Sequence, residues 1–165
     1  SYYIIGFKTV TVDDKDSYVL DLLSIILGWG QSSRLFNEIR MKRGLSYEVG
    51  ATHECNKNFG YFGAYVSTDK KNLKLCKELI LKEFKLENLS NKEIEDSKNM
   101  VEGLKKLRNE DTKELAVSLG VWEHYNKAEN FYDYIKNIRK VTKKDILRVA
   151  RKYFNGKYSE ILISN

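Results

Sequence analysis

The sequence predicts an α+β fold, in which a mostly antiparallel β-sheet has α-helices packed on one face. Strand-like runs rich in β-branched and aromatic residues occur at both ends of the chain and as an adjacent pair in its first half. Consecutive helix-like segments, rather than alternating helices and strands, separate that pair from the last strand, giving the order β-α-α-β-β-α-α-α-α-α-β. A chain of 165 residues, 42% of them hydrophobic, can form its own core, so we expect one domain over residues 1–165.

Apolar periodicity and turn residues set the elements of the first half. The expected elements are a strand over 2–12, helices over 18–27 and 34–42, and two strands over 45–55 and 59–67 that form a hairpin. Gly28 and Gly30 break the first helix, and Gly44 supplies the positive φ that ends the second.

Capping residues set the elements of the second half. The expected elements are helices over 70–86, 91–107, 111–122, 131–139 and 146–154, and a last strand over 159–164. Ser90 with Glu93 forms a capping box, and Thr142 and Asp145 cap the last helix in the same way.

Composition limits the class of partner. The net charge is +6, but lysines alternate with acidic residues, as on solvated helix faces, and no recognition motif accompanies the basic stretch 136–152. We therefore expect no nucleic-acid partner. Nucleic-acid binding would show itself as salt-sensitive retention of DNA or RNA. No apolar run reaches the roughly 18–20 residues that span a bilayer, so no membrane partner is expected.

Two further features concern context. Cys55 and Cys76 form no Cys-x-x-Cys pair, which favours free thiols and a reducing compartment such as the cytoplasm or an organelle matrix. The chain starts at Ser1 with a strand-like run and no visible targeting segment. We expect it to be a piece of a longer polypeptide.

Metal and phosphate sites have little support in the sequence. His53 and His124 are the only histidines, and neither has a second histidine at helical spacing, so no metal ligand is assigned in this chain. Gly28-Trp29-Gly30 lacks the third glycine and the lysine of a phosphate loop and is better explained as a close-packing turn.

Arg40 and Tyr47 form the one candidate catalytic pair. Arg40 is expected near a helix end and Tyr47 at a strand start, and both side chains can donate hydrogen bonds to a carbonyl oxygen or to an oxyanion. The simpler alternative is structural. Arg40 would then be an exposed helix-end cation, and Tyr47 would lie in the sheet core beside Leu45 and Val49.

The run around this pair reads Leu27-Gly28-x-Gly30-x-Ser32-Ser33-Arg34-Leu35-Phe36-x-Glu38-x-Arg40-x-Lys42-x-Gly44-Leu45-x-Tyr47. It resembles the signature of the second, metal-free half of the insulinase/pitrilysin zinc metallopeptidases, whose zinc motif is the inverted H-x-x-E-H. Residues 141–154 resemble the closing helix of the same family, and the similarity extends over essentially all 165 residues.

This resemblance implies a function in peptide-bond hydrolysis. In that family two homologous halves face each other across a chamber; the first holds zinc and binds the substrate peptide along a strand edge, and the second closes the chamber. Arg40 and Tyr47 would contact the substrate carbonyl and the oxyanion. The implied partners are a zinc-bearing half, on the same polypeptide or a partner subunit, and a peptide substrate. A second copy of the full protein, in a homodimer, is a further expected partner.

Departures from the family pattern leave an alternative open. H-x-x-E-H is missing, so the chain alone should neither bind catalytic zinc nor cut peptides, and zinc is expected only in the half that this chain lacks. The segment before Ser32 is short, unlike the glycine-rich loop of the α-subunit of mitochondrial processing peptidase. The family also contains inactive members, so a non-catalytic scaffold or partner subunit, similar to processing-peptidase partners or respiratory core subunits, is the alternative.

Overall fold

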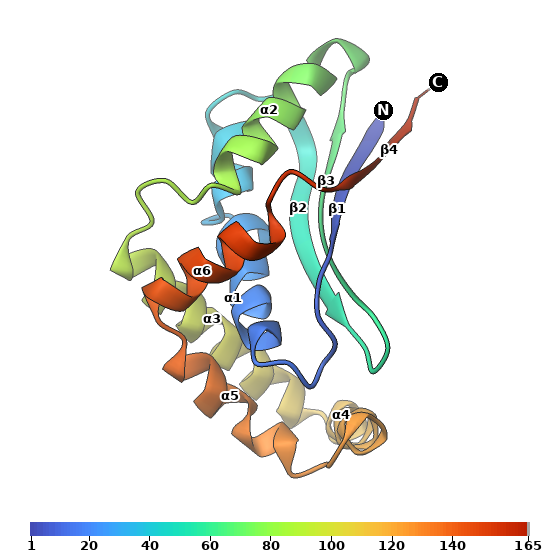
Figure 1. The fold of residues 1–165 in the computed structure, drawn as a ribbon, viewed down its shortest axis with the longest axis vertical. Helices are drawn as coiled ribbons and strands as arrows, with labels where there is room; N and C mark the ends of the chain where they lie inside the picture. Colours follow the sequence, from blue (N-terminus) through green and yellow to red (C-terminus); the bar gives the residue numbers. More distant parts are fainter. Residues whose placement is uncertain (165) are drawn as a thin grey trace.

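A four-stranded antiparallel sheet organises the fold (Figure 1). The computed structural model describes residues 1–164. Its strands are β1 (Tyr2–Lys8), β2 (Ser46–Cys55), β3 (Gly60–Thr68) and β4 (Ser159–Ile163), in the order β2-β3-β1-β4. The first and last strands pair with each other, which brings both ends of the described chain to one edge of the sheet.

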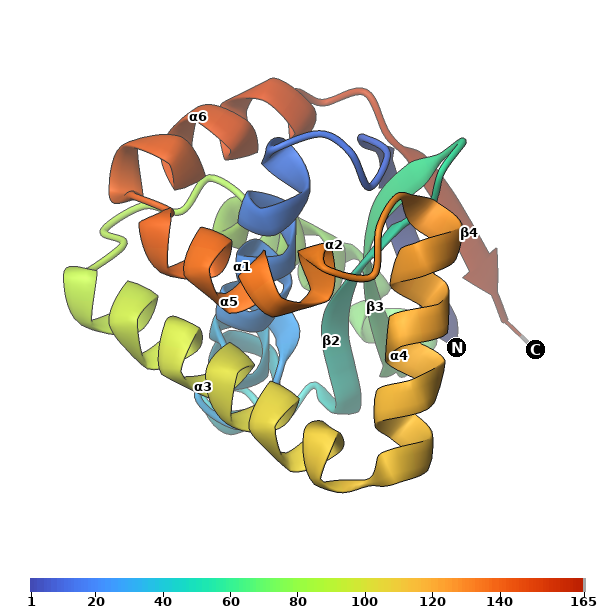
Figure 2. The same cartoon turned by 90° about the horizontal axis from the view of Figure 1, so that it is seen from below.

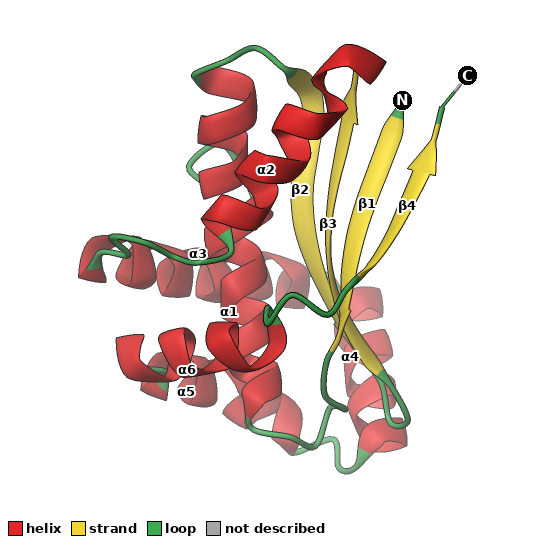
Figure 3. Ribbon diagram, turned by 45° about the horizontal axis from the view of Figure 1, so that its top comes forward, coloured by secondary structure: helices red, strands yellow, loops and turns green. Residues whose placement is uncertain are grey.

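The helices cover one face of this sheet, as expected for the predicted α+β class (Figures 1 and 3). They are α1 (Asp16–Gly28), the π-helical turn η1 (Phe36–Met41), the 3₁₀ turn η2 (Lys70–Asn72), α2 (Leu73–Glu83), α3 (Asn91–Glu110), α4 (Thr112–Tyr125), α5 (Asn130–Lys140) and α6 (Lys143–Tyr153). Helix α1 packs on β2 and is surrounded by α3, α5 and α6. Figure 2, seen from below, shows α4 in front of the strands. The Tyr125 hydroxyl of this helix donates to Asn56 Oδ1 at 3.0 Å.

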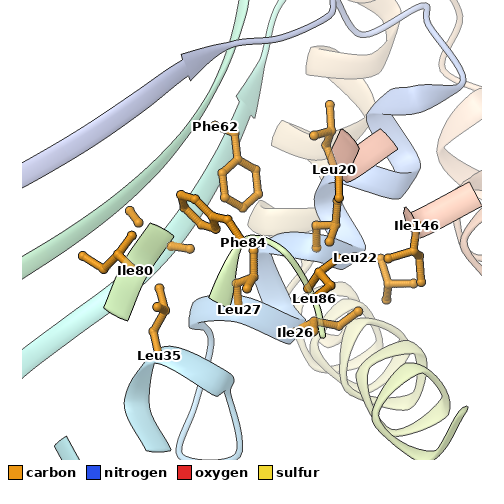
Figure 4. Packing of buried hydrophobic residues seen from close by; sticks show 14 of the residues in the cluster. Leu20, Leu22, Ile26, Leu27, Leu35, Phe62, Ile80, Phe84, Leu86 and Ile146 are labelled. Carbon is orange, nitrogen blue, oxygen red and sulfur yellow. The ribbon is translucent and has the colours of Figure 1, made fainter. Parts of the chain in front are cut away.

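The core lies between the sheet and α1. Phe62 of β3 is fully buried in one cluster with leucines of α1, including Leu20 (Figure 4). Ile5 of β1 is fully buried in the same cluster. Phe84 and Phe154 stack at 4.7 Å between ring centroids and close the core toward α2 and α6. Since each buried side chain of this size contributes about 1.5–3 kcal/mol, this continuous cluster is the main source of stability.

Within residues 1–164, no helix lies over the opposite face of the sheet (Figure 3). Its exposed apolar and aromatic side chains, here called the open-face patch, are 41–65% exposed: Tyr2, Ile4, Tyr61, Ile161 and Ile163. A contiguous group of this kind marks a surface suited to contact with another folded unit.

The predicted caps are confirmed, whereas several element limits differ from the prediction. Ser90 and Thr142 each form their capping box. The first strand ends at Lys8 rather than at residue 12, because its partner strand β3 begins at Gly60. After Lys8 the chain passes close to Gly60: a Cβ on that glycine would lie 1.8 Å from the Val10 carbonyl oxygen. The helix expected over 34–42 is π-helical from 36 to 41, and the one over 70–86 opens with η2 and ends at Glu83.

No helix in residues 1–164 is both long enough and apolar enough to cross a bilayer.

Candidate functional site

The candidate pair lies where η1 turns into β2, and the backbone of this corner is specific. The Lys42 N–H donates to the Asn37 carbonyl at 2.9 Å, the i to i−5 bond of a π-turn, a feature frequent at functional sites. Gly44 then adopts φ 61°, as predicted, and its N–H closes on the Arg40 carbonyl at 2.9 Å. The chain therefore reverses direction within a few residues.

A β-bulge at the start of β2 directs Tyr47 outward. Ser46 pairs with Thr68 and Glu48 with Ser67, so Tyr47 is the extra residue. The buried Ser46 hydroxyl lies 2.6 Å from the carbonyl oxygens of both Glu48 and Ser67 and accepts the Glu48 N–H at 3.0 Å. Bulges re-aim side chains in this way.

The structural alternative for Tyr47 is therefore wrong. Its side chain is 90% exposed, because the bulge removes it from the alternation that buries Val49. Arg40 is exposed at the end of η1, as that alternative expected of it.

The structure brings Arg40 and Tyr47 into contact. Arg40 Nη1 donates to the Tyr47 carbonyl at 2.9 Å, and the guanidinium carbon lies 5.7 Å from the Tyr47 ring centroid and 5.0 Å from that of Phe36. In residues 1–164 no carboxylate pairs with Arg40, and the Tyr47 hydroxyl has no hydrogen-bond partner. Both groups thus keep donors for another molecule.

The other basic side chains of the corner are occupied. Lys42 and Arg43 both pair with Glu38. The hydrogen bond from Lys42, reinforced by Arg43, lowers the pKa of the Glu38 carboxyl against a smaller opposing effect of burial. Glu48 accepts the Tyr2 hydroxyl at 2.6 Å. Among the basic residues of this corner in residues 1–164, Arg40 is therefore the one that has no carboxylate partner.

Arg34, also part of the signature run, has a structural role. Its half-buried guanidinium donates to Glu93 at 2.8 Å, lies 3.4 Å from Glu83 and donates to the Glu87 carbonyl at 3.0 Å. It therefore joins the turn before η1 to α2 and α3 and holds the corner in place.

The remaining sequence candidates have structural roles too. A Cβ at Gly28 would lie 1.8 Å from the Ala51 nitrogen, so this glycine allows α1 to approach β2. His53 lies in β2 and His124 in α4. Within the described residues no group of three or more His, Cys, Asp and Glu side chains is placed to hold a metal ion. Cys55 and Cys76 are free thiols.

Sequence reasoning missed two charge clusters around α1. Asp21 of α1 accepts from His53 Nδ1 at 2.7 Å and from the Tyr134 hydroxyl at 2.8 Å. Burial, with the nearby Asp21 charge, raises the pKa of Tyr134. Asp16 binds Arg148 and Lys152 of α6. In both cases the sequence feature that could have indicated the cluster is an acidic residue of α1, at the start of this otherwise apolar helix or within it.

The sequence of this chain is similar to those of known proteins. The family profile described as "Peptidase M16 inactive domain" matches residues 1–101. An "Uncharacterized zinc protease" of Rickettsia bellii is 30% identical over 167 residues, covering 97% of this chain and 40% of that relative. A "Non-peptidase homolog YmxG" of Helicobacter pylori is 34% identical over 93 residues, covering 54% of this chain and 21% of that relative.

A solved structure has the same fold. The crystal structure of a protease from Helicobacter pylori superposes with a TM-score of 0.87 at 22% identity, over 96% of this chain and 39% of that one. This chain thus spans about two fifths of the length of its Rickettsia bellii relative. The insulinase/pitrilysin resemblance is confirmed: the chain belongs to the peptidase M16 family, and residues 1–101 match the inactive domain of that family.

Proposed function

We propose that this chain is the substrate-contacting and chamber-closing half of an M16 zinc endopeptidase. Arg40 and Tyr47 would donate hydrogen bonds to the carbonyl oxygen of the scissile peptide bond and to the oxyanion that forms when it is attacked. Residues 1–165 form one domain in this proposal, and another half, on the same polypeptide or a partner subunit, holds the zinc.

The observation that carries this proposal is the exposed pairing of the two side chains. An always-charged guanidinium and a phenol at 90% exposure stand together, and neither has an anionic partner within residues 1–164. A bulge that exposes a tyrosine side chain adds little to the stability of the fold. Donors held in advance on a rigid helix-to-strand corner need no reorganisation when charge develops on a substrate.

The open-face patch supports a second folded unit. Ile4 and Ile161 are neighbours across the β1–β4 pairing and are 41% and 57% exposed. Because the Rickettsia bellii relative is much longer than this chain, the zinc-bearing half is the occupant we propose for this face.

The residues of this chain do not fit a zinc site. The chain has no H-x-x-E-H motif, and its histidines lie in different elements without a set of three ligands around either one in residues 1–164. Zinc is therefore assigned to the other half, and the contribution proposed for this chain is confined to binding and orienting the peptide.

The test is kinetic and uses the complete protein. We expect Arg40→Ala and Tyr47→Phe to lower kcat by about 10²-fold each, the order found when one oxyanion donor is removed. Zinc content, measured by elemental analysis, should not change. Tyr132→Phe on α5 (70% exposed) and Arg151→Ala on α6 are matched controls away from the corner. Wild-type kinetics in both corner variants would refute the proposed contacts.

A non-catalytic partner subunit is the second candidate function. It is favoured by the name of the Helicobacter pylori relative, which describes that protein as a non-peptidase homologue. The natural reading frame separates the two candidates. An H-x-x-E-H about one domain upstream supports the peptidase, whereas a frame that begins near Ser1 supports a separate subunit.

A further inference from the structure

A cavity of about 300 Å³ lies among α1, α3, α4 and α5. Most of its wall is apolar, and its lining includes Ile25, Val101, Lys105, Trp122, Phe131 and Tyr134. It shares no lining residue with the Arg40–Tyr47 corner, so it is a separate candidate site. Its volume is at the lower end of the range typical of small-molecule sites.

Lys105 places an uncompensated positive charge at this cavity. Its ammonium donates to the Phe131 carbonyl and lies 3.9 Å from the Phe131 ring centroid and 4.7 Å from that of Tyr134. In residues 1–164 no carboxylate pairs with it. Burial lowers the pKa of Lys105 to about 8, which is what an ammonium without a counter-ion experiences.

The charged neighbours of Lys105 are all engaged with other groups. Asp21 of α1 also lines the cavity and is held by His53 and Tyr134. Arg108 of α3 is a second cation in the lining, and it pairs with Glu114 of α4. Glu102 of α3 pairs with Lys106 and Arg139, and α5 contributes the neutral tyrosines Tyr132 and Tyr134. An anion from outside is therefore the missing partner.

We propose that this cavity binds a small carboxylate with an apolar body, its carboxylate on the Lys105 ammonium and its aromatic or aliphatic body against Trp122, Ile25 and Val101. A charge-assisted bond to the ammonium selects the carboxylate, and the apolar part of the wall favours an apolar body. Two sources supply this chemistry, a free carboxylic acid and the carboxyl terminus of a peptide that ends in an apolar residue.

The proposal predicts how affinity changes with pH. A bound carboxylate favours the charged ammonium, so binding raises the pKa of Lys105 above its free value of about 8. Affinity should be constant between about pH 6, where the ligand carboxyl is ionised, and about pH 7, and should fall as pH rises above about 8, where the free ammonium loses its proton. The ¹³Cε shift of Lys105, followed by NMR with and without ligand, reports this pKa directly.

The binding test uses Trp122 as the reporter in the 165-residue chain. The only other tryptophan, Trp29, is 51% exposed outside the cavity and is replaced by Trp29→Phe. Octanoate and N-acetylphenylalanine are titrated against octanamide and N-acetylphenylalanine amide, which keep each body without the charge. We expect each carboxylate to bind at least tenfold more tightly than its amide; the tighter carboxylate identifies the source.

The Lys105→Gln variant should lose this tenfold preference, whereas Lys106→Gln should keep it, because Lys106 is 73% exposed and paired with Glu102. If the chain that keeps Lys105 binds carboxylates and amides with equal affinity, the proposal is overturned. This comparison does not depend on whether the Lys105→Gln variant folds. An unchanged Lys105 pKa on addition of octanoate overturns it too.

Discussion

At the scale of single residues, the orientation of Tyr47 depends on Ser46. The Ser46 hydroxyl is buried and lies within hydrogen-bond distance of Glu48 and Ser67, on both sides of the bulge. A buried hydroxyl that is removed leaves its partners without a hydrogen bond, at a cost of about 1–3 kcal/mol. One small side chain thus fixes where the phenol of Tyr47 points.

We predict that Ser46→Ala lowers the free energy of unfolding by about 1–2 kcal/mol, because the bulge loses its hydroxyl partner. In the complete protein it should also lower kcat without changing zinc content, because Tyr47 is no longer held beside Arg40. Urea denaturation and steady-state kinetics measure the two effects. Ser159→Ala, an exposed serine of β4, is the matched control, and equal behaviour of the two variants would contradict the role given to Ser46.

At the scale of elements, Asp16 joins the start of α1 to α6. Its buried carboxylate accepts from Arg148 at 2.7 Å, Lys152 at 2.8 Å and the Tyr153 hydroxyl at 3.0 Å. Burial opposes the charge, but these three donors outweigh it and lower the pKa of Asp16 from 3.8 to about 2. Part of the basic stretch 136–152 is therefore used inside the fold.

We predict that Asp16 makes stability sensitive to acid. Because its pKa is lower in the folded state, its contribution is complete above pH 3.8 and is lost as pH falls toward 2. That contribution is about 2 kcal/mol at neutral pH. The stability difference between wild type and Asp16→Asn, measured by urea denaturation from pH 7 to pH 3, should shrink at the acid end. The exposed Asp69→Asn should show no such trend; a constant difference for Asp16→Asn would contradict the linkage.

At the scale of the whole molecule, the sheet is covered on one face only. The helices bury the inward residues of β1 and β3, while the open-face patch leaves Ile4 and Ile161 exposed. Contiguous apolar side chains exposed to water in this way are typical of a surface that contacts another folded unit. It is the surface on which we expect the other half of the protein to pack.

We predict that the double change Ile4→Glu and Ile161→Glu leaves this chain folded but weakens its association with the other half, because two charges would be buried without partners. After proteolytic nicking between the halves, co-elution on size exclusion measures the association. Leu107→Glu with Val117→Glu, exposed on α3 and α4, is the control. Full co-elution of the open-face variant would show that the halves meet elsewhere.

The sequence alone determined the order of the elements, the two capping boxes and the glycine that ends the turn before β2. Each of these depends on residues within a few positions of one another, so periodicity and local hydrogen bonding suffice to predict them. The run from Leu27 to Tyr47 also indicated the family and singled out Arg40 and Tyr47.

Only the tertiary structure decided how those residues are used. The bulge at Tyr47 needs Ser67 of the neighbouring strand, the acid-sensitive link needs Asp16 beside α6, and the ammonium of Lys105 lies over Phe131. Each contact joins positions far apart along the chain. From the local sequence alone, strand alternation predicts a buried Tyr47, and the charge pattern predicts that Lys105 is solvated. Packing overrides both local expectations, because hydrogen bonds and burial are decided by neighbours in space.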